Sequence, residues 1–235
     1  MAGRTIAIGD IHGCRGKLSK ILTHLQLNVQ DKLIFLGDYI DRGPDSAGVI
    51  SDLIWLSQTV SCVFLRGNHE DMLLRTLREE PNMVHLFVEN GGNATMASYD
   101  CWPIPDAHQM FLENTRLYHK EKDTLFVHAG LNPTNGPLEN QDEHDLLWIR
   151  NDYLQNPEHP WPFRIVSGHT PHKEPSVSAD GNRIVIDTGA VYGKNGYGSL
   201  CAFDVTNEKF VILMHDGVVL ERECCPQGTE CMMAR

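Results

Sequence analysis

Short apolar runs alternate with segments of helical periodicity over the first 80 residues of the chain. The runs Arg4–Gly9, Leu33–Gly37 and Val60–Gly67 each end at a glycine, as is typical of buried strands that stop at a turn. Between the runs, large apolar residues recur every three or four positions over Leu18–Leu25 and Val49–Leu56, which predicts amphipathic helices. Strands about 30 residues apart with helices between them favour βαβ units and a parallel sheet.

The middle of the chain is predicted to be mostly helical. A helix is expected over Glu70–Arg78, and residues 81–116 are expected to be helical or irregular, with breaks at Asn90-Gly91-Gly92 and at Pro103 and Pro105. The apolar stretch Thr124–Ala129 predicts a further short strand. The pattern over Asp142–Leu154 predicts another helix.

Beyond Arg164 the pattern changes to short apolar runs separated by turn residues. Asp180-Gly181 and Asp216-Gly217 each stand between two such runs, and an Asp-Gly pair in this setting is a strong signal for a β-hairpin. We therefore expect an α/β fold with a parallel first part and antiparallel hairpins in the second. A single domain is predicted over residues 1–221, followed by a poorly ordered, cysteine-containing tail over residues 222–235.

The composition narrows the classes of partner. The 235 residues include 20 Lys and Arg against 31 Asp and Glu, a net charge of −11, whereas a nucleic-acid-binding protein normally has a basic excess. No apolar run approaches the ~18 residues that a transmembrane helix needs, and the N-terminus has no signal-peptide pattern. We expect no nucleic-acid partner, no membrane association, a cytoplasmic location and seven reduced cysteines.

Five predicted strands each end in a segment whose side chains can bind a metal ion. The first three segments are Gly9-Asp10-Ile11-His12-Gly13, Gly37-Asp38-Tyr39-Ile40-Asp41-Arg42-Gly43 and Arg66-Gly67-Asn68-His69-Glu70. The other two are His128-Ala129-Gly130 and Gly168-His169-Thr170. Because ligands of open α/β sheets bind at the carboxyl ends of the strands, we expect the five segments to converge on one site.

The residue types at these strand ends suit a site for two divalent cations. The candidate ligands are two aspartates, one asparagine and three histidines: Asp10, Asp38, Asn68, His12, His128 and His169. A set of oxygen and nitrogen donors without thiolate suits Mn²⁺, Fe or Zn²⁺, and of these we expect Mn²⁺. Six donors suffice for two ions that share Asp38, and ions about 3.5–4 Å apart are the usual clamp for displacement at phosphorus.

The first three segments together resemble the signature boxes of the phosphoprotein phosphatase family of metallophosphoesterases, intact and in order. The resemblance extends from about Thr5 to about Tyr192 and is strongest to the compact bacterial and phage-type serine/threonine protein phosphatases. It implies a calcineurin-like αββα sandwich with a dinuclear metal centre.

The resemblance also implies a role for each candidate residue. Asp10, His12 and Asp38 would hold the first ion, and Asp38, Asn68, His128 and His169 the second. Asp41 and His69 would form an acid pair. Three arginines would contact the substrate phosphate: Arg42, Arg66 and Arg150. Arg150 rests on Leu147-Trp148-Ile149-Arg150, which is similar to the W-x-R segment of the compact members.

The activity that follows is metal-dependent hydrolysis of phosphomonoesters, in phosphoproteins first and in small phosphoesters besides. A hydroxide bridging the two ions would attack phosphorus in line, and His69, kept protonated by Asp41, would give a proton to the leaving alkoxide. The nearest alternative is a symmetrical diadenosine tetraphosphate hydrolase. That relative usually lacks an aspartate at the place of Asp41 and has Asp at the place of Glu70. A broad-specificity small-molecule phosphoesterase is also open.

Two other classes fit the sequence less well. A silent metal-binding scaffold would be expected to lack ligands or the acid pair, and a nuclease would be expected to show a basic, aromatic-lined stripe. Of the remaining residues near the motifs, Glu70 is expected to favour the N-terminus of the following helix. Asp187 follows a predicted strand and is expected either to support the site from behind or to belong to a turn.

Overall fold

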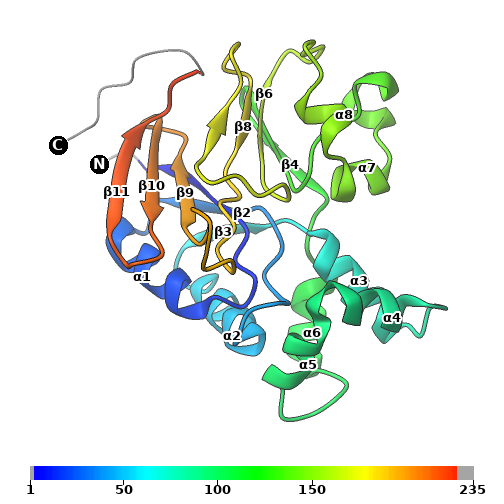
Figure 1. Cartoon of the computed structure of the whole chain (residues 1–235). Helices are drawn as coiled ribbons and strands as arrows, with labels where there is room; N and C mark the ends of the chain where they lie inside the picture. The colour runs from blue at the N-terminus through cyan, green and yellow to red at the C-terminus, as the bar shows by residue number, and fades with distance from the viewer. Residues whose placement is uncertain (1–2, 227–235) are drawn as a thin grey trace.

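The structure, a computed structural model that describes residues 3–226, consists of two β-sheets packed face to face between layers of helices (Figure 1). The first sheet has six strands in the order β11 (Val219–Glu223), β10 (Lys209–Leu213), β9 (Leu200–Asp204), β1 (Thr5–Ile8), β2 (Lys32–Phe35) and β3 (Ser61–Phe64). Strands β1, β2 and β3 are parallel, and β9 is antiparallel to β1. The predicted parallel first part is therefore confirmed.

The second sheet has five strands in the order β4 (Tyr118–Glu121), β5 (Thr124–Val127), β6 (Arg164–Ser167), β8 (Arg183–Val185) and β7 (Ser176–Val177). Its centre, β5-β6-β8, is parallel, and β4 and β7 are antiparallel edge strands. Both Asp-Gly hairpins form as predicted, between β7 and β8 and between β10 and β11. The second part is thus mixed, because hairpins supply its edges while crossovers supply its centre.

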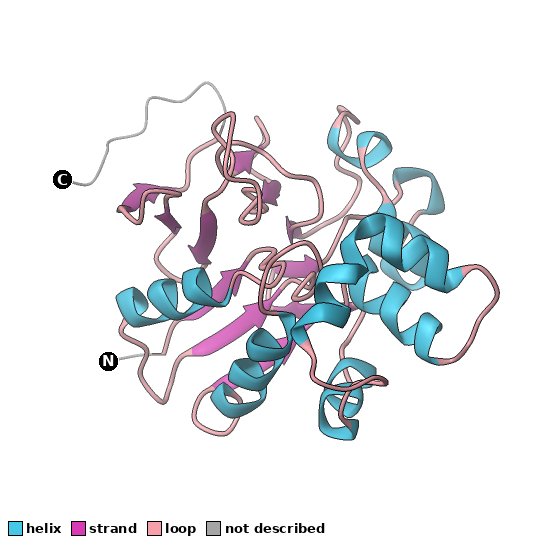
Figure 2. Cartoon of the chain, turned by 60° about the horizontal axis from the view of Figure 1, so that its bottom comes forward, coloured by secondary structure: helices cyan, strands magenta, loops and turns pink. Residues whose placement is uncertain are grey.

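The helices fall into three groups (Figures 1 and 2). Two cover the outer face of the first sheet: α1 (Arg15–Leu25) and α2 (Ser46–Leu56). The chain between β3 and β4 forms a second group: α3 (Asn68–Leu77), α4 (Met83–Phe87), a π-helical turn (Val88–Gly92), α5 (Asn93–Ser98) and α6 (Asp106–Glu113). The third group packs on the outer face of the second sheet: α7 (Glu143–Trp148) and α8 (Asn151–Leu154). Two 3₁₀ turns, Pro133–Asn135 and Leu138–Asn140, precede α7.

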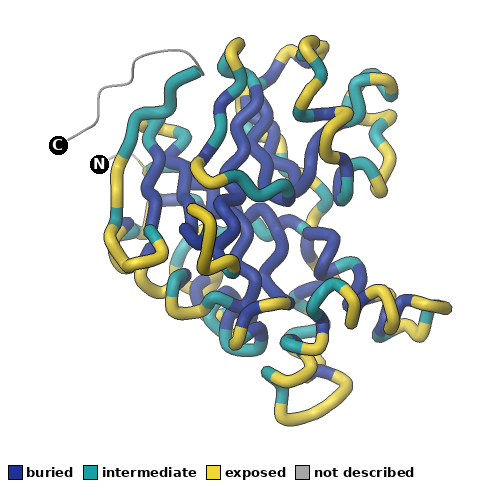
Figure 3. The backbone as a smooth tube through the Cα atoms, viewed as in Figure 1, coloured by how far each residue is buried: buried dark blue, intermediate teal, exposed yellow. Residues whose placement is uncertain are grey.

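Successive side chains of the central strands point to opposite faces, and almost all of them are buried because both faces of each sheet are covered. Ile6 and Ile8 pack under the helices of the first layer, whereas Ala7 between them faces the second sheet, together with Ile34 and Phe126. Figure 3 shows the central strands as buried, whereas the edge strand β11 is partly exposed. Apolar runs of four residues were therefore sufficient to predict these strands.

Two local predictions need correction. The helix expected over Asp142–Leu154 is two helices, α7 and α8, which are separated at Ile149 and Arg150 because Ile149 leaves the helical conformation. The cysteines described as free thiols are Cys14, Cys62, Cys101, Cys201 and Cys224, whereas Cys225 is disulfide-bonded.

The ends of the predicted domain are described only in part. Strand β11 continues to Glu223, two residues beyond the predicted limit, and the amide of Cys224 donates to the carbonyl of Glu208. The rest of the predicted tail, residues 227–235, lies outside the described residues. No helix within residues 3–226 combines the length and apolar character needed to cross a membrane.

Candidate active site

The carboxyl ends of β1, β2, β3, β5 and β6 meet at one place, and each carries one of the predicted segments. All six predicted ligands are buried there, with at most 3% of each residue exposed: Asp10, His12, Asp38, Asn68, His128 and His169. Two groups of titratable side chains have their ligand atoms within 4.8 Å of one another. One is His12, Asp38 and His69, and the other is Asp38, His128 and His169.

Several of these residues adopt a backbone conformation that non-glycine residues rarely use. The φ angle is 46° at His12, 52° at Asp38, 72° at Asp41 and 65° at His169. Such conformations cost about 1–3 kcal/mol each and persist only where the surroundings fix them. Here the loops after β1 and β2 fix each other, since the amide of His12 donates to the carbonyl of Asp38 at 2.8 Å.

Glu70 connects the loops that follow β2 and β3 through hydrogen bonds to their backbone amides. Its carboxylate accepts from the amides of Asp38 and Tyr39, both at 2.8 Å, and from the amide of Gly67 at 2.9 Å. The contact to Gly67 caps α3, as the sequence predicts for Glu70, but the other two bonds tie α3 to the loop after β2. Burial and the nearby Asp38 raise the pKa of Glu70 to about 8, while the three amide donors favour its ionised form.

Glycine is required at two points where the segments cross. A Cβ atom on Gly67 would lie 2.1 Å from Asp38 Oδ1, and one on Gly168 would lie 2.0 Å from Asp10 Oδ1. Both distances are far inside van der Waals contact. The two glycines therefore allow the backbone to pass directly behind the carboxylates of the site.

Three backbone carbonyls set the orientation of the three histidine ligands. His12 Nδ1 lies 2.8 Å from the oxygen of Ile40, His128 Nδ1 lies 2.9 Å from that of Leu36, and His169 Nε2 lies 3.2 Å from that of Trp148. Because a carbonyl only accepts, these ring nitrogens carry the proton and the opposite ones present a lone pair. Burial lowers the pKa of His12 to about 3 and also lowers the pKa of His128 and of His169, which favours the neutral form of each ring.

The lone pairs converge around Asp38 and Asn68. His12 Nε2 and His128 Nε2 each lie 3.4 Å from an oxygen of Asp38, one on each side of the carboxylate. Asn68 Oδ1 lies 3.0 Å from His128 Nε2 and 2.9 Å from His169 Nδ1. Acceptor atoms packed this closely repel one another, and a cation among them would remove that cost. The donor set therefore fits two divalent ions, and Asp38 belongs to both groups of candidate ligands.

Asp10 supports the same conclusion. Its Oδ2 accepts from the amide of His169 at 3.0 Å, but Oδ1 is buried without a partner. Burial and the neighbouring Asp187 and Asp38 raise the pKa of Asp10, as expected of clustered carboxylates. A cation at the free oxygen would supply the missing partner.

Asp41 and His69 form a buried pair at the edge of this cluster. His69 Nδ1 lies 2.6 Å from Asp41 Oδ2, and His69 Nε2 lies 3.8 Å from Asp38 Oδ2. Burial alone would lower the pKa of His69, but Asp38 and Asp41 outweigh burial and raise the pKa. His69 thus holds one proton toward Asp41 and presents its other nitrogen to the ligand cluster.

The three predicted phosphate-binding arginines differ in their surroundings. Arg42 Nη1 donates to His12 Nε2 at 2.9 Å and to the hydroxyl of Tyr192 at 3.1 Å, and Arg150 Nη1 donates to the carbonyl of His169 at 3.0 Å. Both guanidinium groups border the ligand cluster. Arg66 instead donates to the hydroxyl of Thr115 and to the carbonyl of Glu113. Those bonds direct Arg66 toward the end of α6, and its phosphate contact stays a prediction.

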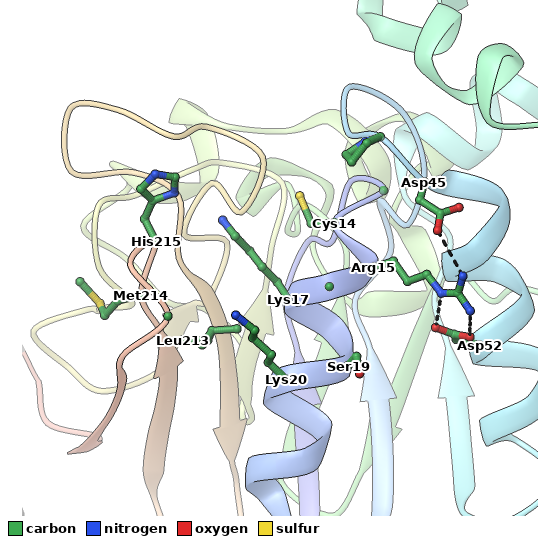
Figure 4. A pocket seen from close by; sticks show the side chains of 14 residues that line it. Cys14, Arg15, Lys17, Ser19, Lys20, Asp45, Asp52, Leu213, Met214 and His215 are labelled. Carbon is green, nitrogen blue, oxygen red and sulfur yellow. Dashed lines mark hydrogen bonds and ion pairs between the residues drawn. The ribbon is translucent and has the colours of Figure 1, made fainter.

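A cavity of about 820 Å³ opens beside the site, between the start of α1 and the chain that follows β10 (Figure 4). Its lining includes Gly13, the last residue of the first metal-binding segment, and Pro44, which directly follows the second. In Figure 4, Lys17 and Lys20 extend from α1 into the space that His215 faces from the other side.

Two of the basic side chains that line this cavity are engaged in ion pairs or hydrogen bonds. Arg15 is paired with Asp45 and Asp52, with nitrogen–oxygen distances of 3.3 and 2.8 Å. Lys17 donates to the carbonyl of Ala190 at 2.6 Å. Lys20 and His215 are the remaining basic groups among the lining residues of this cavity.

A model of the calcineurin-like phosphoesterase family matches residues 3–202. The chain belongs to this family. It is accordingly a hydrolase of the metallophosphoesterase class, and the predicted resemblance and αββα fold are confirmed.

Curated relatives of this phosphoesterase include the bis(5'-nucleosyl)-tetraphosphatase PrpE (asymmetrical) of Bacillus thuringiensis strain Al Hakam and that of Bacillus cereus strain 03BB102. Each is 30% identical over an alignment of 219 residues that covers 79% of this chain and 85% of the relative.

Solved structures with the same fold include a putative diadenosine tetraphosphatase, with a TM-score of 0.66 and 24% identity over 94% of this chain and 93% of that one. A protein serine/threonine phosphatase from Saccharomyces cerevisiae has a TM-score of 0.63 and 15% identity over 97% of this chain and 82% of that one.

The structure of this phosphoesterase adds residues that the sequence did not indicate. Thr95 and Ser46 contact Asp41, and Tyr192 contacts Arg42. The sequence predicts only a break between helices at Asn90-Gly91-Gly92, and nothing in that pattern shows that the following turn reaches the site.

Asp187, for which the sequence left a supporting role and a turn open, is buried. Burial raises its pKa to about 7, and its carboxylate accepts from the amide of Gly189 at 2.8 Å.

Proposed function

We propose that this metallophosphoesterase hydrolyses phosphomonoesters of alcohols, with phosphoserine and phosphothreonine in proteins as its main substrate class. The observation that supports this choice is the Asp41–His69 pair. It is buried, closed by a 2.6 Å bond, and places the second nitrogen of His69 within 3.8 Å of Asp38. A protonated imidazole at this position is suited to give a proton to a leaving group.

The leaving group is what separates the candidate substrates. A serine alkoxide is a strong base and leaves readily only if it is protonated. A nucleotide released from a polyphosphate leaves as a phosphate anion whose own pKa is about 6, so an acid adds little. A carefully built acid pair therefore favours an ester of an alcohol over a phosphoanhydride.

The other residues of the site have matching roles. Two divalent ions held by Asp10, His12, Asp38, Asn68, His128 and His169 would supply an activated water and neutralise phosphate charge. Arg42 and Arg150 border this cluster and would bind the phosphate oxygens, for which a guanidinium has the right geometry. His69 would protonate the leaving oxygen, and Asp41 would hold the imidazole in its charged form. We propose Mn²⁺ as the ion in both positions.

A second candidate activity is cleavage of dinucleoside tetraphosphates. The relatives that are 30% identical carry the name bis(5'-nucleosyl)-tetraphosphatase (asymmetrical). The cavity beside the site could also hold part of an extended substrate, because Lys20 and His215 line it. The sequence predicts symmetrical cleavage as the alternative, and the products of the reaction would distinguish the two modes.

The deciding experiment compares a phosphoserine peptide with diadenosine tetraphosphate, each with Mn²⁺ and with EDTA, for the wild type and for His69→Asn. We expect faster metal-dependent turnover of the peptide. We expect His69→Asn to lower that turnover by roughly 10²–10⁴, the usual contribution of general acid catalysis, without loss of bound metal. Faster wild-type cleavage of the dinucleotide, unaffected by His69→Asn, would contradict the proposal and assign the enzyme to nucleotide hydrolysis.

A further inference from the structure

We propose that Thr95, from the helical segment inserted between β3 and β4, is the positioning residue that holds Asp41 in the acid pair. This inference rests on the proposed role of Asp41 and His69. It assigns a function in the site to α5, which supplies none of the predicted metal ligands or phosphate-binding arginines.

Thr95 contacts Asp41 twice. Its hydroxyl donates to Asp41 Oδ1 at 2.6 Å and accepts from the amide of Asp41 at 2.9 Å. The hydroxyl of Ser46, at the start of α2, lies 2.9 Å from that of Thr95 and 3.1 Å from the amide of Asp41. Asp41, Thr95 and Ser46 are each 0% exposed, so water cannot replace these bonds.

The number of available donor hydrogens determines which group donates in each hydrogen bond of this network. The amide of Asp41 is a donor, and its carboxylate accepts at both oxygens, from His69 at Oδ2 and from Thr95 at Oδ1. Since the single proton of Thr95 is used on Asp41, Ser46 must donate to Thr95. The bonds therefore run from Ser46 through Thr95 to Asp41, and every proton supports the ionised carboxylate that His69 requires.

The same inserted turn also positions Arg42. The amide of Arg42 donates to the carbonyl of Gly91 at 3.1 Å. Gly91 has a φ of 100°, and a Cβ atom there would lie 2.7 Å from Arg42 Cγ. Residues 91–95 thus hold both Asp41 and Arg42, whose own φ values of 72° and 66° need external support.

Loss of the Thr95 hydroxyl would leave Asp41 Oδ1 buried and without a donor, which a carboxylate tolerates poorly. Asp41 would then turn or recruit another donor, and His69 would lose its fixed orientation. Loss of the hydroxyl would therefore impair proton donation by His69 and leave phosphate binding unchanged. Substrates that need a proton should therefore suffer most.

The test measures kcat and KM of Thr95→Val, Thr95→Ser and Ser98→Ala on a phosphoserine peptide and on 4-nitrophenyl phosphate, whose leaving group needs no proton. Valine keeps the shape of threonine without its hydroxyl, and serine restores the hydroxyl. Ser98 is the matched control because its hydroxyl accepts from the amide of Ala47 at 3.1 Å and donates to the backbone carbonyl of Thr95 at 2.8 Å, so it joins α5 to α2 without touching Asp41 or the Thr95 hydroxyl. His69→Asn is measured beside them.

We expect Thr95→Val to lower kcat on the peptide by about ten-fold or more, and on 4-nitrophenyl phosphate by less than about three-fold. KM and bound metal should be unchanged, and Thr95→Ser should recover most of the loss. An equal loss on both substrates, or the same pattern in Ser98→Ala, would overturn the role of Thr95. If His69→Asn is selective for the peptide and Thr95→Val is not, only this inference fails. If His69→Asn is not selective either, the proposed acid role fails as well.

Discussion

The two ends of strands β1 and β2 use buried aspartates in opposite ways. At the amino ends, Asp31 is 0% exposed and accepts five hydrogen bonds, three from Arg4 and two from Asn28. At the carboxyl ends, Asp10 is 2% exposed, accepts one bond from His169, and has one oxygen without a partner. Burial alone would raise the pKa of Asp31, but its donors outweigh burial and lower the pKa to about 2, whereas the pKa of Asp10 is raised.

The difference shows where the fold is stabilised and where it is prepared for a ligand. A buried carboxylate whose two oxygens both accept hydrogen bonds from neighbouring donors contributes to the stability of the fold. A carboxylate left incomplete beside other carboxylates destabilises the fold until a cation completes it. Four variants test this contrast, two at the site and two away from it.

Asp38→Asn should have the largest effect. Asp38 Oδ2 faces His12, and Asp38 Oδ1 faces His128, so a neutral amide weakens both ion positions together. We expect metal content to fall from about two ions per chain to less than one, and phosphoesterase activity to be lost. Elemental analysis after dialysis measures the first, and circular dichroism checks the fold. Two ions retained in Asp38→Asn would refute the shared role of this carboxylate.

Asp31→Asn should have the next largest effect, on stability alone. An amide cannot pair with Arg4, so we expect the free energy of unfolding at pH 7 to fall by roughly 1–3 kcal/mol. Because the pKa of Asp31 is lowered in the fold, its contribution is present above pH about 4 and disappears as the pH falls toward about 2. Urea titrations across that range should show the variant and the wild type converging. A constant difference would mean that the charge is not what stabilises this end.

Asp10→Asn should have a smaller effect of opposite sign in metal-free protein. An amide oxygen can still accept from the amide of His169, while the buried charge is removed. We expect a gain of about 1 kcal/mol in EDTA, together with loss of activity in Mn²⁺. Because the pKa of Asp10 is raised in the fold, the wild type is penalised only above the ordinary pKa of the group, and the gain should vanish in acid. A variant less stable than the wild type in EDTA would show that Asp10 is satisfied without a cation.

The sequence was sufficient for the parts of this contrast that depend on local pattern. Apolar runs that stop at glycine located β1, β2 and β3, and the residues after them located Asp10, Asp38 and the acid pair. The pattern could not show the clamp between Arg4 and Asp31, because the contact joins residues 27 positions apart that belong to no motif. The reach of the Gly91–Thr95 turn into the site is equally invisible, since it depends on how α5 packs against α2.

Asp52→Asn should have the smallest effect on stability. It shows how little an exposed ion pair contributes beside the buried pair of Arg4 and Asp31. Asp52 binds Arg15 through two bonds of 2.8 Å, a geometry as good as that of Arg4 and Asp31, but the side chains of Arg15 and Asp52 are 47% and 34% exposed. Water competes for an exposed pair and salt screens it, so we expect a loss of at most about 0.5 kcal/mol that shrinks further at high ionic strength. The measurement is a urea titration at low and at high salt beside Asp31→Asn. A loss equal to that of Asp31→Asn would mean that bond geometry, and not burial, sets the value of these ion pairs, and the contrast between the two strand ends would then need another cause.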